Sequence, residues 1–230
     1  MEDTKEILIT GATGNVGGAV LDNLASTDVA LRVLTGNESK GQALRDRGVE
    51  DIVVGDFLKP ETLGPALEGV STIFLLTPIN PQQVPQASNV IKAAKESGTD
   101  PRIVRLSIHQ ASHEAPTRNS RQHAEIEDEL ISSGLPYTLL RPQSFMQNTL
   151  ATARTVASEG RIYQPFKDGK LGMIDARDIG EGAAKVLTRE GHEGEGYSNF
   201  TTEDVEQLTG HPATSYKEFA TDYERVFRGA

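Results

Sequence analysis

The sequence contains no cysteine, which excludes disulfide bonds, thiol chemistry and thiolate metal sites. No apolar run approaches the length of about 20 residues that a membrane-spanning helix needs. The polar N-terminal residues, MEDTK, lack the apolar core of a signal peptide. A formal net charge of −10 argues against a broad surface for the phosphates of a nucleic acid. We therefore expect a soluble, cytoplasmic protein without a nucleic-acid or membrane partner.

The remaining composition is typical of a folded domain. Hydrophobic residues make up 37% of the chain and charged residues 24%, so the chain is neither disordered nor embedded in a membrane. A length of 230 residues is enough for one domain with a sizeable core. We find no internal repeat, low-complexity tract or long linker.

The most informative feature is the glycine-rich segment GATGNVGG at residues 11–18. It follows the apolar run ILIT, and the apolar residues after it share one helical face. Strand, glycine turn and helix are the context that a dinucleotide-binding fingerprint requires. Gly11 would allow the tight turn, Gly14 the approach of a pyrophosphate, and Gly17 the close packing of helix and strand. The alternative is a plain glycine-rich turn. We predict a nucleotide cofactor on the N-terminus of the helix.

Short apolar runs alternate with helical patterns along the first two thirds of the chain. This alternation predicts a Rossmann-like, doubly wound α/β fold, in which helices cover both faces of a parallel sheet. The ligand crevice of such a sheet lies at the carboxyl ends of its strands. The expected strands are 7–10, 31–34, 52–54, 72–76, 103–108 and 137–141, and the expected helices are 17–25, 40–47, 61–67, 84–97 and 122–133.

The composition changes after residue 158, where glycines become more frequent. We expect an NAD(P)-binding core at 1–158 and a small, reduced C-terminal lobe at 159–230, packed on the core as one structural unit. A helix is expected at 179–188. Aromatic residues recur at helical spacing over 215–227, which indicates core packing of a terminal helix or, alternatively, a partner-binding face.

The ends of the second and third strands carry the first polar candidates. Asn37 is a candidate donor to a phosphate, and Lys40 adds a positive charge that Glu38 partly opposes. No acidic residue for a ribose 2′-hydroxyl follows the second strand directly, which favours NADP(H) over NAD(H). Asp56 either accepts from the adenine amino group or caps a helix, and Phe57 lies near the ring.

The later strand ends predict the position of the nicotinamide. The backbone at Thr77 and Pro78 would line the cofactor channel, and Ser107 and Pro142 would lie near the nicotinamide. His123 begins a charged helical pattern and either contacts the ribose or donates a proton near neutral pH. The other acidic residues of this pattern fit a solvated helix face.

The segment after the sixth strand is the expected acceptor site. Phe145 and Met146 would offer an apolar surface to a flat ring and Asn148 a polar group, although each side chain fits the core equally well. The histidines His109, His113 and His123 lack a suitably spaced carboxylate, so no metal site is expected.

The motifs ILITGATGNVG, GDF, HAEIE, SGLPYTLLRP, FMQN and IDARDI together resemble the NmrA-like group of atypical short-chain dehydrogenase/reductases. This group includes NAD(P)H:quinone and azo reductases and isoflavone-reductase-like proteins. The resemblance covers about residues 5–198 and returns near the C-terminus. The expected cofactor-binding residues are Gly11, Thr13, Gly14, Asn15, Val16, Gly17, Asn37, Lys40, Asp56, Phe57, Thr77, Pro78, Ser107, His123 and Pro142.

Three departures from the family pattern matter. The Tyr-xxx-Lys pair of standard short-chain dehydrogenases is replaced by Asn119 and His123, so no phenol exchanges a proton with an alcohol. Gly36 stands where many NADP-using relatives have arginine, which leaves the cofactor choice open. The segment at 196–205 reads as though most of the substrate lobe is absent, which predicts a shallower and wetter crevice.

Two functions follow from the resemblance. The first is an NAD(P)H-dependent reductase that transfers hydride to a flat, electron-poor small molecule such as a quinone or azo compound, with His123 as the candidate catalytic residue. The second is an NAD(P)-binding redox sensor that acts through a protein partner without turnover. A sugar-nucleotide epimerase is disfavoured because such enzymes generally use the missing tyrosine.

Overall fold

The computed structural model describes residues 6–163, 169–197 and 202–229. The N-terminal residues 1–5 and most of the junction at which the lobe is expected to be missing, 198–201, lie outside the described residues. Within the described ranges, none of the helices is both long and apolar enough to cross a membrane.

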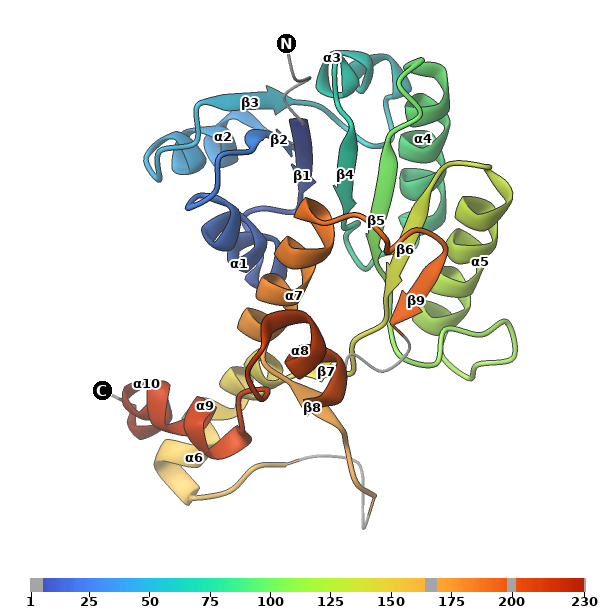
Figure 1. The fold of residues 1–230 in the computed structure, drawn as a ribbon. Coiled ribbons are helices and arrows are strands. Elements are labelled where there is room, and N and C mark those ends of the chain that lie inside the picture. Colours follow the sequence, from blue (N-terminus) through green and yellow to red (C-terminus); the bar gives the residue numbers. More distant parts are fainter. Residues whose placement is uncertain (1–5, 164–168, 198–201, 230) are drawn as a thin grey trace.

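A seven-stranded sheet forms the centre of the molecule, with the strand order β3-β2-β1-β4-β5-β6-β9 (Figure 1). Every neighbouring pair is parallel. The order reverses between β1 and β4, which is the point where a doubly wound sheet opens a crevice at its carboxyl edge. The fold is Rossmann-like. The strands are β1 (Glu6–Thr10), β2 (Ala30–Thr35), β3 (Asp51–Val54), β4 (Thr72–Leu75), β5 (Arg102–Leu106), β6 (Tyr137–Leu140) and β9 (Glu195–Tyr197).

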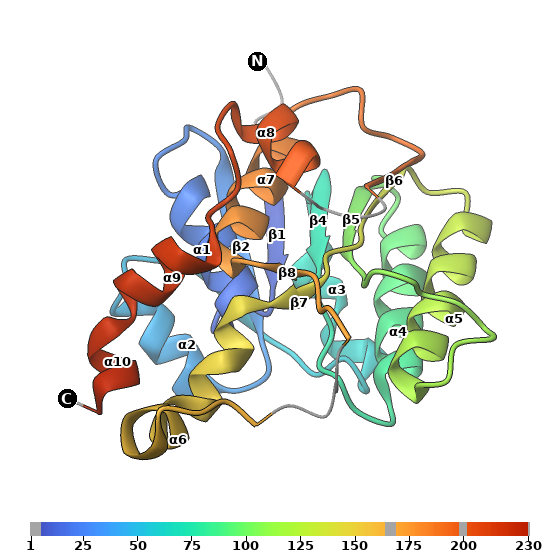
Figure 2. The ribbon, with the colours of Figure 1, turned by 90° about the horizontal axis from the view of Figure 1, so that it is seen from below.

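Helices cover both faces of this sheet (Figure 2). One apolar cluster joins the sheet to α1 (Asn15–Leu24), α2 (Glu38–Arg45), α7 (Ala176–Thr188) and α8 (Thr202–Thr209). The other joins it to α3 (Gly64–Leu67), α4 (Gln83–Glu96) and α5 (Arg118–Ser132). Strand β1 serves both clusters, because Ile7 and Ile9 face the first and Leu8 faces the second.

Helices α1 and α7 approach each other closely on the first face. A β carbon at Gly180 of α7 would lie 2.4 Å from the β carbon of Ala19 on α1, so no larger side chain fits there. Helix α7 therefore supports the helix that follows the glycine turn.

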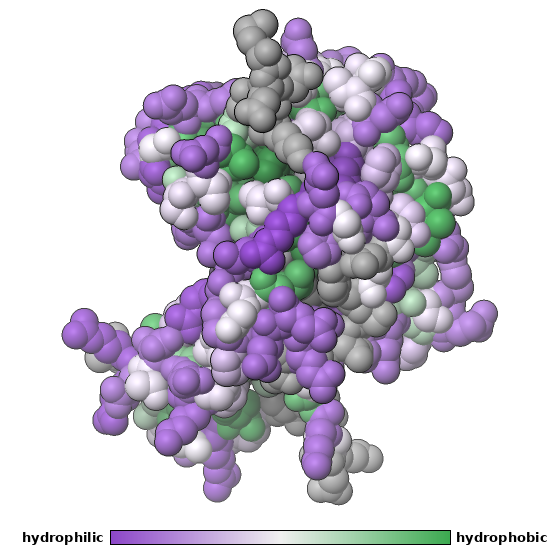
Figure 3. Space-filling view, viewed as in Figure 1, coloured by the Kyte–Doolittle hydropathy of each residue, from purple (hydrophilic) through white to green (hydrophobic). Residues whose placement is uncertain are grey.

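The remaining elements lie beyond the carboxyl edge of the sheet and project from the main body (Figures 1 and 3). They are the paired strands β7 (Ser144–Phe145) and β8 (Met173–Ile174), the 3-10 helix η2 (Met146–Thr152), α6 (Ala153–Glu159), α9 (Tyr216–Asp222) and α10 (Glu224–Arg228). Although α7 and β9 follow residue 158, they pack on or join the central sheet. The division of the chain at residue 158 stays a prediction.

The expected terminal helix is two short helices. Tyr223 leaves the helical conformation, with φ −100° and ψ 18°, and separates α9 from α10. The aromatic residues pack together as expected of a core: the ring of fully buried Phe219 lies 5.8 Å from that of Tyr216, 4.7 Å from that of Tyr223 and 6.4 Å from that of Phe227.

The helix expected at 61–67 is also divided. It consists of the 3-10 helix η1 (Pro60–Thr62) and the one-turn helix α3. Pro65 has no N–H group to continue a helix from the preceding turn, which accounts for the break.

Candidate cofactor and acceptor site

The turn between β1 and α1 has the geometry that the glycine motif predicts. Gly11 has a φ of +69°, and a β carbon there would lie 2.8 Å from Cδ2 of Leu76. A β carbon at Gly17 would lie 2.2 Å from the carbonyl oxygen of Gly11. Both positions therefore require glycine, one for its backbone conformation and the other for close packing of the helix against the turn.

The N-terminus of α1 is open to an anion. Its N-cap, Gly14, has no side chain to satisfy the first N–H groups, and no acidic residue lies in the first turn. Thr13, Gly14 and Asn15 are exposed. Val16 is buried in the core, so its side chain is not available to a cofactor and only its backbone N–H faces this end. The helix dipole adds a partial positive charge.

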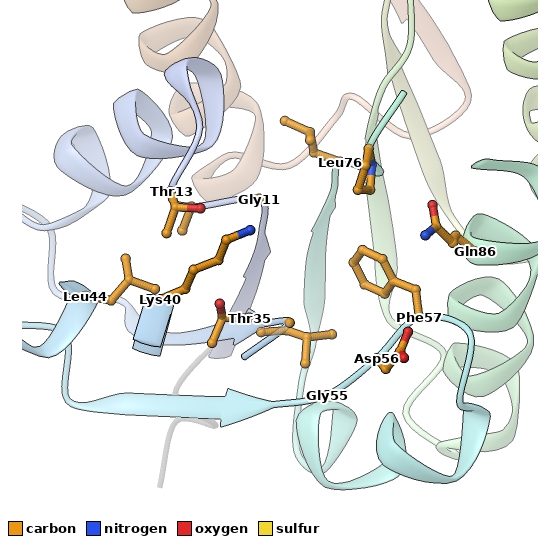
Figure 4. Close-up of a pocket in the computed structure, with 14 residues that line it drawn as sticks. Gly11, Thr13, Thr35, Lys40, Leu44, Gly55, Asp56, Phe57, Leu76 and Gln86 are labelled. Atoms are coloured by element: carbon orange, nitrogen blue, oxygen red, sulfur yellow. The ribbon is translucent and has the colours of Figure 1, made fainter. Parts of the chain in front are cut away.

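A pocket of about 300 Å³ begins beside this turn. Figure 4 shows Lys40 and Phe57 entering it from opposite sides. It extends across the carboxyl ends of β1, β2 and β3. Its lining residues are Gly11, Ala12, Thr13, Leu34, Thr35, Gly36, Lys40, Leu44, Gly55, Asp56, Phe57, Leu76, Pro78 and Gln86.

Asn37 and Lys40 have different positions relative to this pocket. Asn37 is the N-cap of α2, where its side-chain oxygen accepts the backbone N–H of Lys40 at 2.9 Å, and it is not among the lining residues. The Lys40 side chain lines the pocket. Glu38, which was expected to oppose Lys40, instead pairs with Arg45 at 2.5 Å. The positive charge of Lys40 is thus available to a ligand.

Asp56 and Phe57 both line the pocket. One carboxylate oxygen of Asp56 accepts the backbone N–H of Leu58 at 2.9 Å, so Asp56 also shapes the turn that presents Phe57. The backbone carbonyl of Phe57 accepts the side-chain amide of Asn89 at 2.8 Å. The Phe57 ring is therefore held at the pocket wall.

Thr77 and Pro78, which follow β4, differ in their exposure to the pocket. Pro78 is exposed and lines the pocket, whereas Thr77 is buried and accepts a hydrogen bond from Nη2 of Arg105 at 3.0 Å. The backbone N–H of Leu76 donates to Oγ1 of Thr10 at 2.8 Å, which fixes β4 beside the glycine turn. Thr77 can therefore offer only its backbone to a ligand, and its place in a cofactor channel stays a prediction.

Ser107, at the end of β5, and His123, on α5, meet in a buried polar cluster. Nδ1 of His123 lies 3.3 Å from Oγ of Ser107, and Nε2 lies 3.1 Å from the side-chain nitrogen of Gln83. The Ser107 hydroxyl donates to Oε1 of Glu127. Since that hydroxyl has a single proton, it must accept from Nδ1–H of His123, and Nε2 accepts from the Gln83 amide. The cluster defines a neutral imidazole with the proton on Nδ1.

His123 does not have the properties expected of a proton donor. Its side chain is 4% exposed. Burial, followed by the nearby charge of Arg105, lowers the pKa of His123 to about 3. The ring is therefore neutral near pH 7 and faces other side chains rather than the crevice. His123 lies on the buried face of α5. Sequence periodicity alone did not assign it to that face.

Buried Glu127 and half-buried Arg141 are partners that the sequence reasoning missed as site residues. Their side chains form a bidentate pair, with Nε to Oε1 at 2.9 Å and Nη2 to Oε2 at 2.7 Å. Hydrogen bonding to Glu127 raises the pKa of Arg141. Since Glu127 also accepts from Ser107, one carboxylate holds the ends of β5 and β6. Their positions in the HAEIE and LLRP motifs were the available signal.

The residues expected around the acceptor are separated. Pro142 is buried, and its carbonyl accepts the backbone N–H of His109 at 2.8 Å. Met146 is 5% exposed and Phe145 packs against the core, so neither forms an open apolar surface. Asn148 is exposed. Met146 is thus buried, and Phe145 is partly buried against the core; whether either contacts an acceptor stays a prediction.

An apolar cavity of about 280 Å³, here called the Tyr216 pocket, includes Asn148. The exposed fractions of Ile162, Leu171 and Tyr216 are 45%, 44% and 37%. The Tyr216 hydroxyl donates to Oγ1 of Thr149 at 3.3 Å and so ties α9 to η2. The pocket is lined by Ser144, Asn148, Thr149, Ile162, Leu171, Met173 and Tyr216.

A second polar contact fixes the segment beside this pocket. Gln147 donates to Asp175 at 2.7 Å and accepts the backbone N–H of Ala176 at 2.9 Å. Asp175 also pairs with Arg177, which lies 2.8 Å from Asp222 of α9. The C-terminal helices are thereby connected to the chain segment that follows β6. In the part of the chain that the structure describes, no group of three His, Asp or Glu side chains is placed to hold a metal ion.

The fold and the open glycine turn define a Rossmann-like protein of the dinucleotide-binding type. A model of the NmrA-like family matches residues 3–207. The chain belongs to the NmrA-like family.

Two similar proteins are a reductase and an oxidoreductase by name. The chain is 35% identical over 191 residues to an NAD(P)H azoreductase of Xenophilus azovorans, covering 83% of this chain and 66% of that protein. It is 34% identical over 194 residues to quinone oxidoreductase 2 of Escherichia coli, covering 83% and 67%. The chain therefore spans about two thirds of the length of these relatives.

A solved structure of similar fold contains a cofactor. The NADPH-dependent quinone oxidoreductase of Escherichia coli in complex with NADPH has a TM-score of 0.85 and 26% sequence identity. The match covers 95% of this chain and 99% of that chain.

Proposed function

We propose that the chain is an NAD(P)H-dependent reductase that transfers hydride to a flat, electron-poor acceptor. The observation that carries this proposal is the open N-terminus of α1 beside the pocket that Lys40 and Phe57 line. The pyrophosphate would lie on the glycine turn, the adenosine in this pocket, and the nicotinamide near Ser107 and Pro142. The residues fit the cofactor, because a phosphate site, a cationic side chain and an aromatic ring occur in this order along the carboxyl edge.

The charge at the end of β2 supports NADPH rather than NADH. An acidic side chain at the end of β2 would bind a ribose 2′-hydroxyl and repel a 2′-phosphate. Here the end of β2 is Thr35 and Gly36, and the charged side chain beside them is Lys40. We therefore propose that Lys40 binds the 2′-phosphate.

The Tyr216 pocket is the proposed acceptor site. The described side chains that line it are all uncharged, which favours a neutral ring, and its volume of about 280 Å³ suits a compact flat molecule. The names of the azoreductase and the quinone oxidoreductase support acceptors of this kind.

The chain mainly binds and orients the reactants in this proposal. When bound, the nicotinamide cofactor supplies the hydride. Asn119 replaces the usual tyrosine, and His123 is buried and neutral, so the protons that the reduced acceptor needs would come from water. The open Tyr216 pocket gives water access to it.

The test is nicotinamide fluorescence in one cuvette. Mixing the protein with NADPH should enhance the fluorescence, and adding a simple quinone should then accelerate its decay beyond a protein-free control. No enhancement with either NADPH or NADH would refute the proposed cofactor site.

A redox sensor is the second proposal, supported by the openness of the Tyr216 pocket. Several of its apolar side chains are more than a third exposed, so the pocket excludes little water from a reaction. For a sensor, the fluorescence enhancement should persist after quinone addition. Protein partners would then bind the reduced and oxidised forms unequally.

A further inference from the structure

Arg105 on β5 is a buried cation without a carboxylate partner. The side chain is 1% exposed. Its Nη1 donates to the carbonyl of Leu75 at 3.0 Å and its Nη2 to Oγ1 of Thr77 at 3.0 Å. Its Nε has no hydrogen-bond partner. Within the described residues, no acidic side chain forms an ion pair with it. Isolated buried charges are rare because their desolvation is unfavourable.

The surrounding groups leave this charge uncompensated. Glu127 is the acidic residue whose charge acts on Arg105, but its oxygens are bonded to Arg141 and Ser107. His123 is neutral near pH 7. Burial lowers the pKa of Arg105 to about 10, so it remains protonated at pH 7. Two guanidinium groups, the buried one of Arg105 and the 25%-exposed one of Arg141, therefore share the carboxylate of Glu127.

The excess positive charge lies behind the proposed cofactor channel. Arg105 binds Thr77, which stands between the pocket-lining residues Leu76 and Pro78. Arg105 precedes Ser107 by two positions, so the Cα atoms of these two residues are about 6.6 Å apart along the strand. Ser107 is where the nicotinamide is proposed to lie.

We propose that Arg105 makes the site discriminate between the two redox forms of the nicotinamide. The reduced ring is uncharged, whereas the oxidised ring carries a positive charge. An oxidised ring near Ser107 would be repelled by the buried guanidinium, whereas the reduced ring would not. The adenosine and phosphates are the same in both forms, so their contribution cancels in the ratio of affinities. The site would therefore bind the oxidised form more weakly than the reduced form.

This inference rests on the proposed cofactor site, and the experiment separates the two. Dissociation constants for NADPH and NADP⁺ are measured by calorimetry for the wild type and for two neutral variants, Arg105→Met and Arg105→Gln. Thermal unfolding shows which variants are folded. The wild type should bind NADPH more tightly, and each folded neutral variant should reduce the ratio of the two constants about fivefold.

Two further variants separate charge from structure. Arg105→Lys keeps the charge and should keep most of the ratio. Arg102→Met removes an arginine from the opposite end of the same strand, where the guanidinium is paired with Glu193 at 3.2 Å, and should leave the ratio unchanged. A wild type that binds neither form would refute the proposed function. Binding of both forms without preference, or a ratio unaltered in the folded neutral variants, would overturn the role of Arg105 alone.

Discussion

A β carbon at Gly17 would stand 2.2 Å from the carbonyl oxygen of Gly11, well inside van der Waals contact. The first turn of α1 thus lies against the peptide that leaves β1. This contact sets the distance between the sheet and the helix N-terminus that is proposed to hold the pyrophosphate.

The first prediction is that Gly17→Ala displaces α1 and weakens cofactor binding. The added methyl group meets backbone atoms that cannot rotate away, and overpacking of this kind destabilises by about 1–3 kcal/mol. Urea unfolding gives the loss of stability and nicotinamide fluorescence the loss of affinity. Gly64→Ala is the matched control, because no atom lies within 4 Å of its added methyl group. Equal NADPH affinity in the wild type and Gly17→Ala would contradict the prediction.

The sequence predicted the sheet and the glycine turn because their determinants are local. Ile7, Leu8 and Ile9 alternate between two apolar clusters, which a short apolar run with flanking helices indicates. The small strands β7 and β8 were not expected as a pair, since two residues each are too few for a periodicity.

The buried polar cluster was not predictable because its members come from separate elements. Gln83 belongs to α4, Ser107 follows β5, and His123 and Glu127 belong to α5. Their contacts span up to 40 positions along the chain and depend on how α4 and α5 pack on the sheet. Met146 illustrates the complementary difficulty: an apolar residue after a strand fits the core and a binding surface equally well until the packing is known.

The second prediction concerns Lys40 and the choice of cofactor. Removing its ammonium group in Lys40→Met should raise the dissociation constant for NADPH about fivefold, because a charged contact to the 2′-phosphate is lost. The constant for NADH should hardly change, since NADH lacks that phosphate. Fluorescence titration with both cofactors gives the two constants. Lys92→Met removes an exposed lysine on α4 and is the control. An equal rise in the dissociation constants for NADPH and NADH would mean that Lys40 does not bind the 2′-phosphate.

The third prediction is a pH dependence of stability that originates at His123. In the unfolded chain a histidine takes up a proton below a pKa of about 6.5, whereas burial and Arg105 lower the folded pKa of His123 to about 3. Between these values the unfolded state binds more protons, so the free energy of unfolding falls as the pH is lowered. The contribution of His123 reaches at most about 1.4 kcal/mol per pH unit.

Urea unfolding at several pH values between 4 and 7 measures this slope. His123→Gln should flatten it relative to the wild type. His113→Gln should not, because the His113 side chain is 55% exposed to solvent. Equal slopes in the wild type and His123→Gln would mean that folding does not lower the pKa of His123.

The fourth prediction tests the Tyr216 pocket as the acceptor site. Tyr216→Ala removes the aromatic wall, and the loss of ring stacking should raise the KM for a quinone about fivefold while the KM for NADPH stays the same. Tyr216→Phe keeps the ring and loses only the 3.3 Å hydrogen bond to Thr149, so it should behave like the wild type. Because the Tyr216 ring also lies 5.8 Å from that of Phe219, thermal unfolding must show that both variants are folded.

If the KM for NADPH rises as much as that for the quinone, Tyr216 acts through the cofactor site rather than on the acceptor. If the phenylalanine variant loses as much as the alanine variant, the hydroxyl that ties α9 to η2 matters and the ring does not.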